Sequence, residues 1–448
     1  MKRAAILGAG FSRAISFHMP ITDGLGKDTL ELLRKSGIDL SARPFSGEGF
    51  EAWLSRLAEP QPDLNTAENL ENQALFYRVS AALREVILTS QMYVTHSALP
   101  WWLQRLVGCY HYTNTTAATF NYDQLLEYAL EAAHLRDRDS RLVRFDDALR
   151  YGPQPVSEPA AGLAYGSTRA ETFQVLKLHG SVDSYWVPGD TSGASIARWD
   201  SKARWGDAFI PSDRIRKQLL PGRETFLIPP AAAKSSFYAN PVSRELWQQA
   251  SRALAESTQV DLVGYSVPMT DLVTAGMLGD RLRNSEALIT VVNVDAEPVI
   301  NALTRLGIDE DRIVAIEGKD ACADYTLALE KTFEPRWTYK DPFALGNPKL
   351  GIGRSSQVVE SAIVGYKGAA ADGIVELTVS EVESRGGDDV AITLDEFLKA
   401  AGGHLQPRAR LVWPNGDKSF VANTELTEDG SRHEGWLTLQ PTAAHFPA

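Results

Sequence analysis

Three polar side chains follow two short apolar segments, at positions where a parallel sheet would expose them to a ligand. Asn121 and Asp123 lie in "TFNYDQLLE", directly after one apolar run, and His179 lies in "LKLHGSVD", directly after another. An amide can orient a hydroxyl group or a water, and an imidazole with an ordinary pKa of about 6.5 can accept a proton at neutral pH. Because the carboxyl ends of neighbouring parallel strands meet at one edge of a sheet, we expect these three groups to lie close together.

Each of the three residues also has a structural interpretation, which the sequence leaves open. Asn121 and Asp123 could instead cap the helix that is expected to begin near Gln124, because Asn and Asp accept hydrogen bonds from the free N–H groups of a helix start. His179 could be a hydrogen-bonded residue of the loop that follows its strand. The functional interpretation is favoured because all three groups share one expected sheet edge with a glycine-rich loop.

That loop is Gly8-Ala9-Gly10, which follows the apolar run 4–7. A first glycine permits a tight turn after a strand, and a second lets backbone N–H groups approach a phosphate at the start of a helix. Arg13 stands where a hydride-transferring dinucleotide enzyme normally has a third glycine. The loop therefore indicates nucleotide binding without redox chemistry, although a plain turn between strand and helix has the same pattern.

Short apolar runs recur at intervals that suit a sheet able to position these groups. Several runs are continuously apolar, as in a parallel sheet that helices cover on both faces. The predicted fold class is therefore α/β, with a Rossmann-like doubly wound parallel sheet. The expected strands are 4–7, 117–120, 173–178, 226–228, 260–263, 289–294 and 313–316.

Two long segments interrupt this series of strands within an expected catalytic domain at 1–335. The segment at about 27–115 is too long for one crossover and has apolar residues at helical spacing, which predicts a helical insertion. The segment at about 181–224 carries three tryptophans among Pro, Gly, Asp and Ser, which predicts an irregular insertion. The residues at helical spacing are Leu75, Val79, Leu83 and Ile87.

The last part of the chain differs in character from the rest. Prolines and glycines at 336–353 predict a linker, and 354–448 is expected to be a small β-rich domain. Asn415-Gly416 supplies the positive φ that a tight hairpin turn needs. This domain could bind a partner, support an oligomer or only cover the core. Its expected elements are strands at 374–379 and 410–421 and a helix at 394–400.

Composition narrows the class of protein. The 448 residues carry a formal net charge of −12 and contain two cysteines, Cys109 and Cys322. An acidic balance without a basic cluster argues against a nucleic-acid surface, since phosphate backbones are bound by grouped Lys and Arg. Two isolated cysteines suggest a reducing compartment and no zinc site. No apolar run approaches ~18 residues and no leader precedes the first strand, so a cytoplasmic protein without membrane contact is predicted.

Five segments of the first 330 residues resemble, in chain order, the signature segments of sirtuin-like (silent information regulator 2-like) proteins. They are "GAGFS" at 8–12, "FNYD" at 120–123, "LHGS" at 178–181, "GYS" at 264–266 and "VNVD" at 292–295. The resemblance implies that NAD is the substrate and that His179 is the catalytic base. It also implies that Asn121 and Asp123 face the nicotinamide ribose and amide. The NAD-binding residues that it implies are Gly8, Ala9, Gly10, Phe11, Ser12, Gly264, Ser266 and Asn293.

The chain also departs from the family pattern. Protein-deacylating sirtuins carry a zinc module with four cysteines, and the sequence "HMPITD" at 18–23 replaces their Gly-Ile-Pro-Asp-Phe-Arg. The sequence is therefore similar to the zinc-free prokaryotic branch that acts in antiphage defence by consuming NAD. This resemblance implies an NAD glycohydrolase without a metal.

Unrestrained NAD hydrolysis would poison a cytoplasm, so such an activity is expected to be silent until a partner or ligand activates it. The expected means of control are a sensor protein encoded nearby, for example an ATPase, an Argonaute-type protein or a nucleotide-processing protein, assembly into a homo-oligomer, or both. Two alternatives remain open at this point. The protein could be a non-enzymatic module that binds NAD or ADP-ribose, or it could be a deacylase or ADP-ribosyltransferase.

Overall fold

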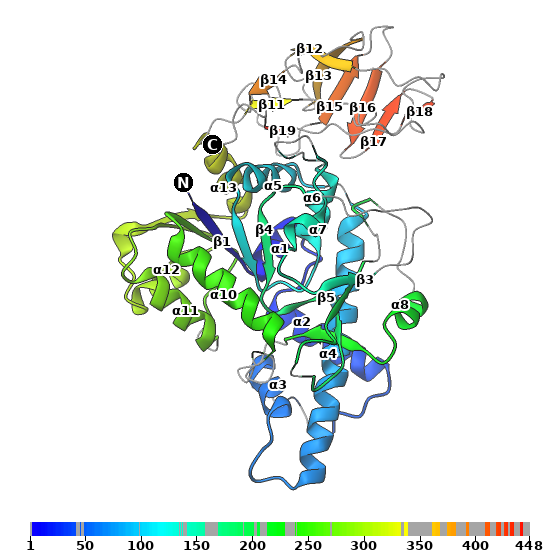
Figure 1. Cartoon of the computed structure of the whole chain (residues 1–448). Coiled ribbons are helices and arrows are strands. Elements are labelled where there is room, and N and C mark those ends of the chain that lie inside the picture. The colour runs from blue at the N-terminus through cyan, green and yellow to red at the C-terminus, as the bar shows by residue number, and fades with distance from the viewer. Residues whose placement is uncertain are drawn as a thin grey trace.

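A parallel sheet of six strands forms the centre of the computed structural model (Figure 1). The strands lie in the order β10-β9-β8-β1-β2-β4, and each neighbouring pair is parallel. If the six strands of this sheet are numbered 1 to 6 along the chain, their order read from β4 to β10 is 3-2-1-4-5-6. This is the Rossmann order. The α/β fold class is confirmed. The strands are β1 (Arg3–Leu7), β2 (Thr116–Thr119), β4 (Gln174–Lys177), β8 (Gln259–Val263), β9 (Leu288–Asn293) and β10 (Ile313–Glu317).

The structure describes most of the first 332 residues and the backbones of short strands beyond them. The described residues are 2–41, 45, 49–97, 99–133, 135, 137, 141–156, 169–190, 192–200, 204–206, 213–228, 238, 240–268 and 271–332, with strand backbones between 336 and 441.

Helices cover both faces of the sheet, and β1 shows why. Its side chains alternate in direction, so that Ala5 and Leu7 belong to one apolar cluster while Ala4 and Ile6 belong to the other. All four are buried, as expected for a central parallel strand. The face of Ala5 is covered by α1 (Ala9–Ile15), α5 (Trp101–Thr113), α6 (Leu125–Ala132) and α13 (Ala321–Lys331). The face of Ala4 is covered by α10 (Pro241–Glu256), α11 (Leu272–Leu282) and α12 (Glu297–Arg305).

The segment between β1 and β2 contains the predicted helices. The longest, α4, begins with a capping box in which Asn65 accepts from the Glu68 N–H and Glu68 accepts from the Asn65 N–H. The four apolar residues that predicted it are buried in α4. In Figure 1, α3 and the first half of α4 extend away from the sheet. The helices are α2 (Thr22–Lys35), α3 (Phe50–Ala58) and α4 (Thr66–Thr95).

The segment at 181–224 is more regular than its composition predicts. It contributes strands to a second, four-stranded sheet in the order β3-β6-β5-β7. The expected sheet strand at 226–228 is corrected by this finding, because β7 pairs with β5 instead of joining the parallel sheet. Polar residues such as Asp183 hid the pattern, since β5 is buried along its whole length although half of it is polar. The elements are α7 (Phe145–Ala148), β3 (Gln154–Val156), β5 (Gly180–Trp186), β6 (Ala197–Trp199), α8 (Asp213–Leu219) and β7 (Glu224–Leu227).

Strands dominate the described part of the last hundred residues. One sheet has the order β12-β13-β15-β16-β17-β18, and a second has the order β14-β11-β19. The expected strand at 374–379 lies in β13, and 410–421 forms the antiparallel pair β15 and β16. β11 lies at the start of the expected linker. The expected helix at 394–400 and the turn at Asn415-Gly416 lie outside the described residues.

The bounds of these strands follow. They are β11 (Arg336–Thr338), β12 (Ser361–Lys367), β13 (Ile374–Glu381), β14 (Ala391–Thr393), β15 (Arg408–Val412), β16 (Lys418–Ala422), β17 (Glu425–Glu428), β18 (Ser431–His433) and β19 (Gln440–Pro441). Across the described part of the chain, every helix is too short or too polar to cross a bilayer.

Candidate active site

A pocket of about 450 Å³ opens at the carboxyl ends of the parallel strands. It lies beside the boundary between β1 and β8, where the strand order reverses and where open α/β sheets bind their ligands. Side chains and backbone from the ends of β1, β2, β4, β8 and β9 meet there. Of the residues that the sequence singled out, those that line the pocket are Gly8, Ala9, Gly10, Ser12, Asn121, Asp123, His179, Gly264, Ser266 and Asn293.

The glycines bring two loops into direct contact. The Gly8 N–H donates to the Val263 carbonyl at 3.0 Å, and the Gly10 N–H donates to the Gly264 carbonyl at 2.9 Å. A Cβ at Gly8 would lie 2.6 Å from the Gly264 oxygen, and one at Gly264, where φ is +60°, would lie 2.1 Å from the Phe11 nitrogen. These two N–H groups are thus bonded within the protein. The Gly8 and Gly10 N–H groups therefore donate to carbonyls and not outward to a phosphate, and the close packing of the two loops shapes the pocket floor.

Phe11 lies apart from the other residues of the glycine loop. Its side chain is buried under the sheet and packs edge to face on Trp102, with ring centroids 5.9 Å apart. It does not line the pocket as the structure describes it. The Phe11 side chain therefore anchors α1 in the core, as a large aromatic side chain can, and its contact with NAD stays a prediction.

Asn121 is held in one orientation by two hydrogen bonds. Its Nδ2 donates to the Gly8 carbonyl at 2.8 Å and to the Ser12 hydroxyl at 2.9 Å. Because a carbonyl only accepts, the Gly8 contact fixes which end of the amide is the NH₂ group. The Oδ1 atom forms no hydrogen bond with the described residues, and Asn121 lines the pocket. The amide therefore offers an acceptor to a hydroxyl or a water.

Asp123 combines the two interpretations that the sequence left open. Its Oδ2 accepts from the Ser12 hydroxyl at 2.6 Å, and its Oδ1 accepts from the Leu125 N–H at 3.1 Å, at the start of α6. It thus caps a helix and lines the pocket. Asn121 makes no such cap contact, because its Oδ1 accepts from no described helix N–H and the Leu125 N–H donates to Asp123 instead.

His179 lies at the turn between β4 and β5. Its carbonyl accepts from the Ile228 N–H at 2.9 Å, and its ring lies 4.9 Å from the Phe120 ring. The chain turns sharply just after it, at Gly180, where φ is +77° and a Cβ would lie 2.2 Å from the Phe226 oxygen. Only glycine fits that position, so Gly180 allows the turn that directs His179 into the pocket.

A carboxylate that the sequence did not single out closes one side of the pocket. Asp271 is buried, and its Oδ2 accepts from the Tyr265 hydroxyl at 3.1 Å and from the Thr274 hydroxyl at 2.8 Å. Burial, with Asp271 beside it, raises the pKa of Tyr265, so its hydroxyl remains a donor. The Tyr265 ring stacks on Phe120 at 4.7 Å. The polar spacing in "GYSVPMTD" was the available signal for Asp271.

The pocket is acidic. Glu51, Asp123 and Asp271 line it, and the described lining residues include no Lys or Arg. Arg13, which replaced the expected third glycine, lies outside and donates to the carbonyls of Phe17 and Met19. These bonds hold the loop that includes Met19, Pro20 and Ile21, which line the pocket. In the described part of the chain, no group of His, Cys, Asp and Glu is arranged to hold a metal ion.

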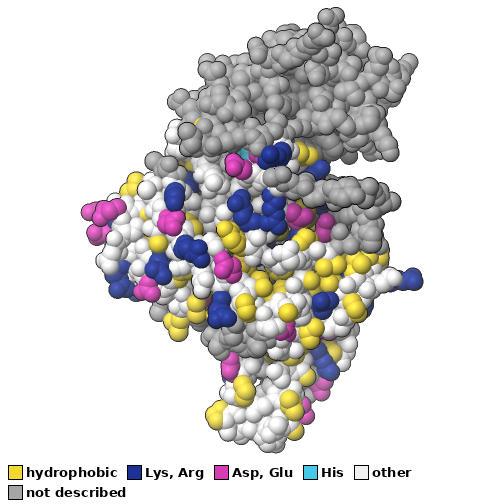
Figure 2. Space-filling view, in the orientation of Figure 1, with side chains coloured by type: hydrophobic (Ala, Val, Ile, Leu, Met, Phe, Trp, Pro, Cys, Tyr) yellow, Lys and Arg dark blue, Asp and Glu magenta, His cyan; other side chains and the backbone are white. Residues whose placement is uncertain are grey.

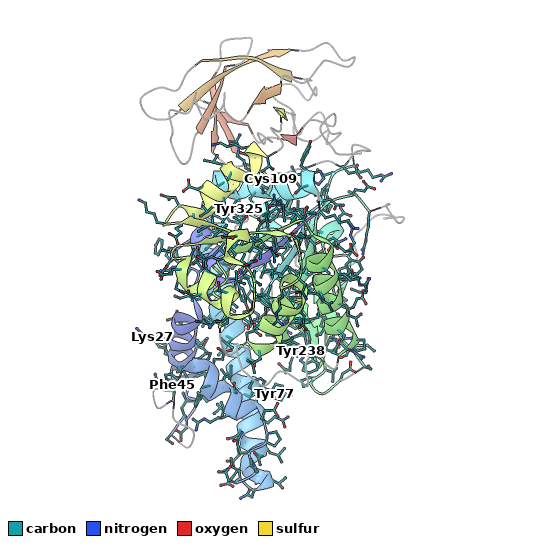
Figure 3. The ribbon with its side chains drawn as sticks, turned by 90° about the vertical axis from the view of Figure 1, so that its left-hand side faces the viewer. Lys27, Phe45, Tyr77, Cys109, Tyr238 and Tyr325 are labelled. Atoms are coloured by element: carbon teal, nitrogen blue, oxygen red, sulfur yellow. The ribbon has the colours of Figure 1, made fainter. Side chains whose placement is uncertain are left out.

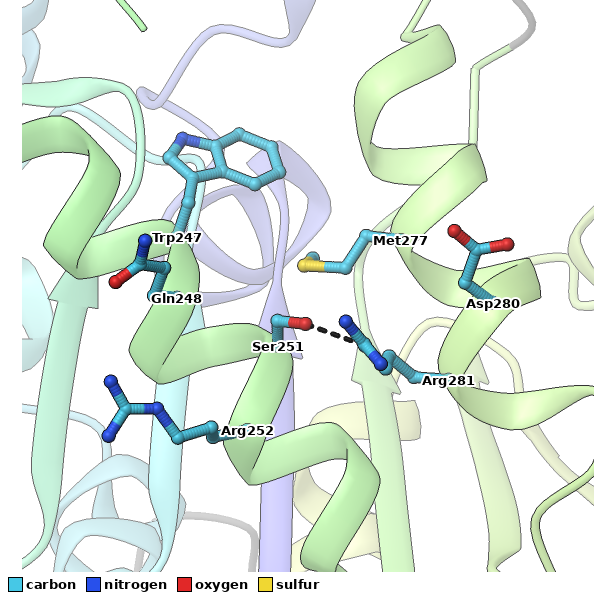
Figure 4. A pocket seen from close by; sticks show the side chains of 7 residues that line it. All are labelled: Trp247, Gln248, Ser251, Arg252, Met277, Asp280 and Arg281. Atoms are coloured by element: carbon cyan, nitrogen blue, oxygen red, sulfur yellow. Dashed lines mark hydrogen bonds between the residues drawn. The ribbon is translucent and has the colours of Figure 1, made fainter. Parts of the chain in front are cut away.

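A groove of about 500 Å³ lies between α10 and α11 and contains none of the predicted site residues (Figure 4). Arg281 donates to the Ser251 hydroxyl at 2.7 Å across it. Trp247 lines this groove, and its ring lies 6.3 Å from His179 and 6.1 Å from Phe120. The Trp247 indole thus lies beside two side chains that line the pocket.

Comparisons with known proteins add two structural likenesses. No protein-family model and no curated protein matches the sequence. A structure described as "Structural Basis for the Mechanism and Regulation of Sir2 Enzymes" is similar with a TM-score of 0.34 and 12% identity, over 74% of this chain and 93% of that chain. A Sir2 mutant with a p53 peptide and NAD is similar with a TM-score of 0.32 and 11% identity, over 74% and 92%.

Proposed function

We propose that the protein is a sirtuin-like NAD glycohydrolase that cleaves NAD to nicotinamide and ADP-ribose. The observation that carries the proposal is the fixed Asn121 amide, which lines the same pocket as His179 at the switch point of a Rossmann sheet. A dinucleotide is the ligand that this position in the fold most often binds. The pocket volume of about 450 Å³ also falls in the range of small-molecule sites.

The chemistry needs few groups. The bond between nicotinamide nitrogen and ribose C1′ breaks with its electron pair on the nitrogen, so a neutral nicotinamide leaves without a general acid. The oxygen of a water then bonds to C1′, and its proton passes to a base. Asn121 can hold the water or a ribose hydroxyl through Oδ1, and His179 can accept the proton.

The charges of the pocket suit this reaction. The nicotinamide ring of NAD is cationic, and positive charge moves to the ribose as the bond breaks. The carboxylates of Glu51, Asp123 and Asp271 line the same pocket and favour positive charge there. The reaction therefore gains stabilisation at the point where the charge develops.

The first prediction concerns turnover. The purified protein, alone and with the products of neighbouring genes, is incubated with NAD while nicotinamide and ADP-ribose are quantified. Asn121→Ala and His179→Ala should each lower turnover by about 10²-fold or more, because each removes a group that contacts the reacting atoms. Asn65→Ala, at the outer end of α4, is the control for a change in stability alone.

Either of two results would contradict this proposal. Bound NAD without any nicotinamide release would instead indicate a binding module. Equal activity in Asn121→Ala and the native protein, with a large loss of thermal stability, would leave Asn121 only a structural role.

The second prediction concerns the choice of dinucleotide. NADP carries a 2′-phosphate, which proteins usually pair with an Arg, and the described pocket lining contains no Lys or Arg. We expect NAD to raise the melting temperature of the protein more than NADP at equal concentration, measured by scanning fluorimetry. Equal shifts from both dinucleotides would contradict the proposed preference for NAD.

Control and setting belong to the same proposal. Unrestrained NAD hydrolysis would poison a cytoplasm, so we infer that an antiphage effector of this type is silent until a sensor protein or self-assembly activates it. The face in Figure 2 intersperses Lys and Arg with Asp and Glu, which suits contact with a protein better than a nucleic-acid backbone. Co-purification with the neighbouring gene products, followed by the turnover assay above, identifies the activator.

A further inference from the structure

Lys177 is a buried lysine that the function described so far does not use. It ends β4, two residues before His179, and its side chain is only 8% exposed. Its ammonium lies 3.1 Å from the Glu127 Oε1 atom and donates to the carbonyl oxygen of Asp123. Glu127 belongs to α6 and is also buried. An ion pair thus lies beneath the loop that carries Asn121 and Asp123.

Stability alone is a weak reason for such a pair. Removing two charges from water costs several kcal/mol per ion, and exchanging a buried pair for apolar side chains is often neutral or stabilising. Burial raises the pKa of Glu127, and the charge of Lys177 counteracts that rise. The other contact of the Lys177 ammonium, with the Asp123 carbonyl, indicates a second role.

That contact is one of several hydrogen bonds that join segment 119–124 to segment 177–183. The Leu178 N–H donates to the Thr119 carbonyl at 3.0 Å, and the Val182 N–H donates to the Tyr122 carbonyl at 2.9 Å. Both are backbone bonds that any sequence with this fold would keep. The bond from Lys177 to Asp123 depends on a side chain. So do the bond from the Ser181 hydroxyl to the Tyr122 carbonyl at 3.3 Å and the bond from the Gln124 amide to the Asp183 carboxylate at 2.9 Å, but among these three only the Lys177 bond holds the backbone of Asp123 itself.

Together these bonds set the distance between the residues proposed to react. One segment carries Asn121 and Asp123, and the other carries His179. Asp123 in turn holds Ser12, which accepts from the Asn121 amide. A shift of the Asp123 backbone would therefore displace the Asn121 oxygen relative to the imidazole.

We propose that Lys177 is a positioning residue, whose ammonium fixes the Asp123 backbone and thereby the spacing between the Asn121 amide and His179. This inference rests on the proposed function, because the spacing matters only for a reaction at that site. A misplacement of about 1 Å can cost about 10²-fold in rate. Binding of NAD depends on the whole pocket and should change less than the rate.

The test uses the full chain with four changes: Lys177→Met, Lys177→Arg, Glu127→Gln and the double change Lys177→Met with Glu127→Leu. Nicotinamide release gives kcat and KM, calorimetry gives NAD affinity, and thermal melting gives stability. Lys177→Met should lower both kcat and the melting temperature, since it leaves Glu127 buried without its cation. The double change should recover the melting temperature while kcat stays at least about tenfold low and KM changes by less than about threefold.

The remaining variants separate positioning from stability. Glu127→Gln keeps Lys177 as the donor to the Asp123 carbonyl and should retain most of the native kcat. Lys177→Arg should have a kcat between those of Lys177→Met and the native protein. A double variant with normal kcat would overturn the positioning role, and so would rates that follow the melting temperature across all four variants. A native protein that releases no nicotinamide would instead overturn the proposed function itself, and the positioning role with it.

Discussion

The two ends of the Asn121 amide differ, because the NH₂ group is bonded within the protein and Oδ1 accepts no hydrogen bond from the described residues. Its NH₂ group bonds to Gly8 and Ser12, which belong to another strand end more than a hundred positions away in the sequence. The alternative role as a helix cap falls to Asp123. Sequence position predicted that these residues lie near each other, but the bonds that assign their roles needed the folded chain.

Gly264 provides the third prediction, at the scale of one residue. Gly264→Ala combines a positive φ with a Cβ only 2.1 Å from the Phe11 nitrogen, so we expect a larger loss of stability than the about 1–2 kcal/mol of a left-handed alanine alone. Gly37→Ala is the matched control, because φ there is +75° and nothing lies within 4 Å of the added Cβ. Urea denaturation measures both changes.

NAD binding distinguishes the two glycine variants further. Gly264→Ala should also weaken NAD binding, because the added Cβ pushes apart the two loops that shape the pocket floor. A Gly264→Ala protein as stable as Gly37→Ala, with unchanged NAD affinity, would contradict the role given to the contact between the loops.

At the scale of elements, α4 joins the outer surface to the site. Gln91 of α4 accepts from the Gln124 N–H at 2.7 Å, directly beside Asp123, and Arg84 donates to the Val182 carbonyl at 3.0 Å. The helix thus contacts both segments that carry the proposed catalytic residues. Its first turns lie far from this contact, where α4 extends away from the sheet (Figure 1).

The fourth prediction concerns the start of this helix. Asn65→Ala removes the side-chain acceptor of the capping box and should lower the free energy of unfolding by about 1 kcal/mol, measured by urea denaturation. Turnover should not change, because Gln91 lies seven turns away along α4 and keeps its own packing. A loss of turnover without a loss of stability would show that the outer end of α4 acts on the site.

At the scale of the whole molecule, buried thiols and phenols determine how stability responds to alkaline pH. Cys109 on α5 and Tyr325 on α13 lie in one apolar cluster, close to each other in Figure 3. Burial raises the pKa of the Cys109 thiol and of the Tyr325 phenol. Burial also raises the pKa of the Cys322 thiol from 9.0 to about 12.

The fifth prediction follows from the sign of these shifts. Between pH 9 and 12 the unfolded chain loses the Cys322 proton while the folded chain keeps it, so the free energy of unfolding falls as pH rises. The slope is at most about 1.4 kcal/mol per pH unit for each such group. Denaturation at several alkaline pH values should show this fall, and Cys322→Ala should make it less steep. A slope that Cys322→Ala leaves unchanged would contradict the assignment.

The sequence by itself determined the α/β class, and ten of the eleven residues that it singled out for the site line the pocket. Both follow from local pattern, because an apolar run buried on both faces predicts a parallel strand and polar residues at its end reach the sheet edge. The segment at 181–224 was predicted less well, since its strands carry buried polar residues such as Asp183, whose partners come from elsewhere in the chain.

Only the tertiary structure decided the rest. It showed that Gly8 and Gly264 pack against each other, that Phe11 belongs to the core, that Asp271 lines the pocket and that Lys177 bonds to the Asp123 carbonyl. The physical reason is the same in each case. A contact between strand ends joins residues that are distant in the chain, and no local spacing records which backbone or carboxylate a side chain will meet after folding.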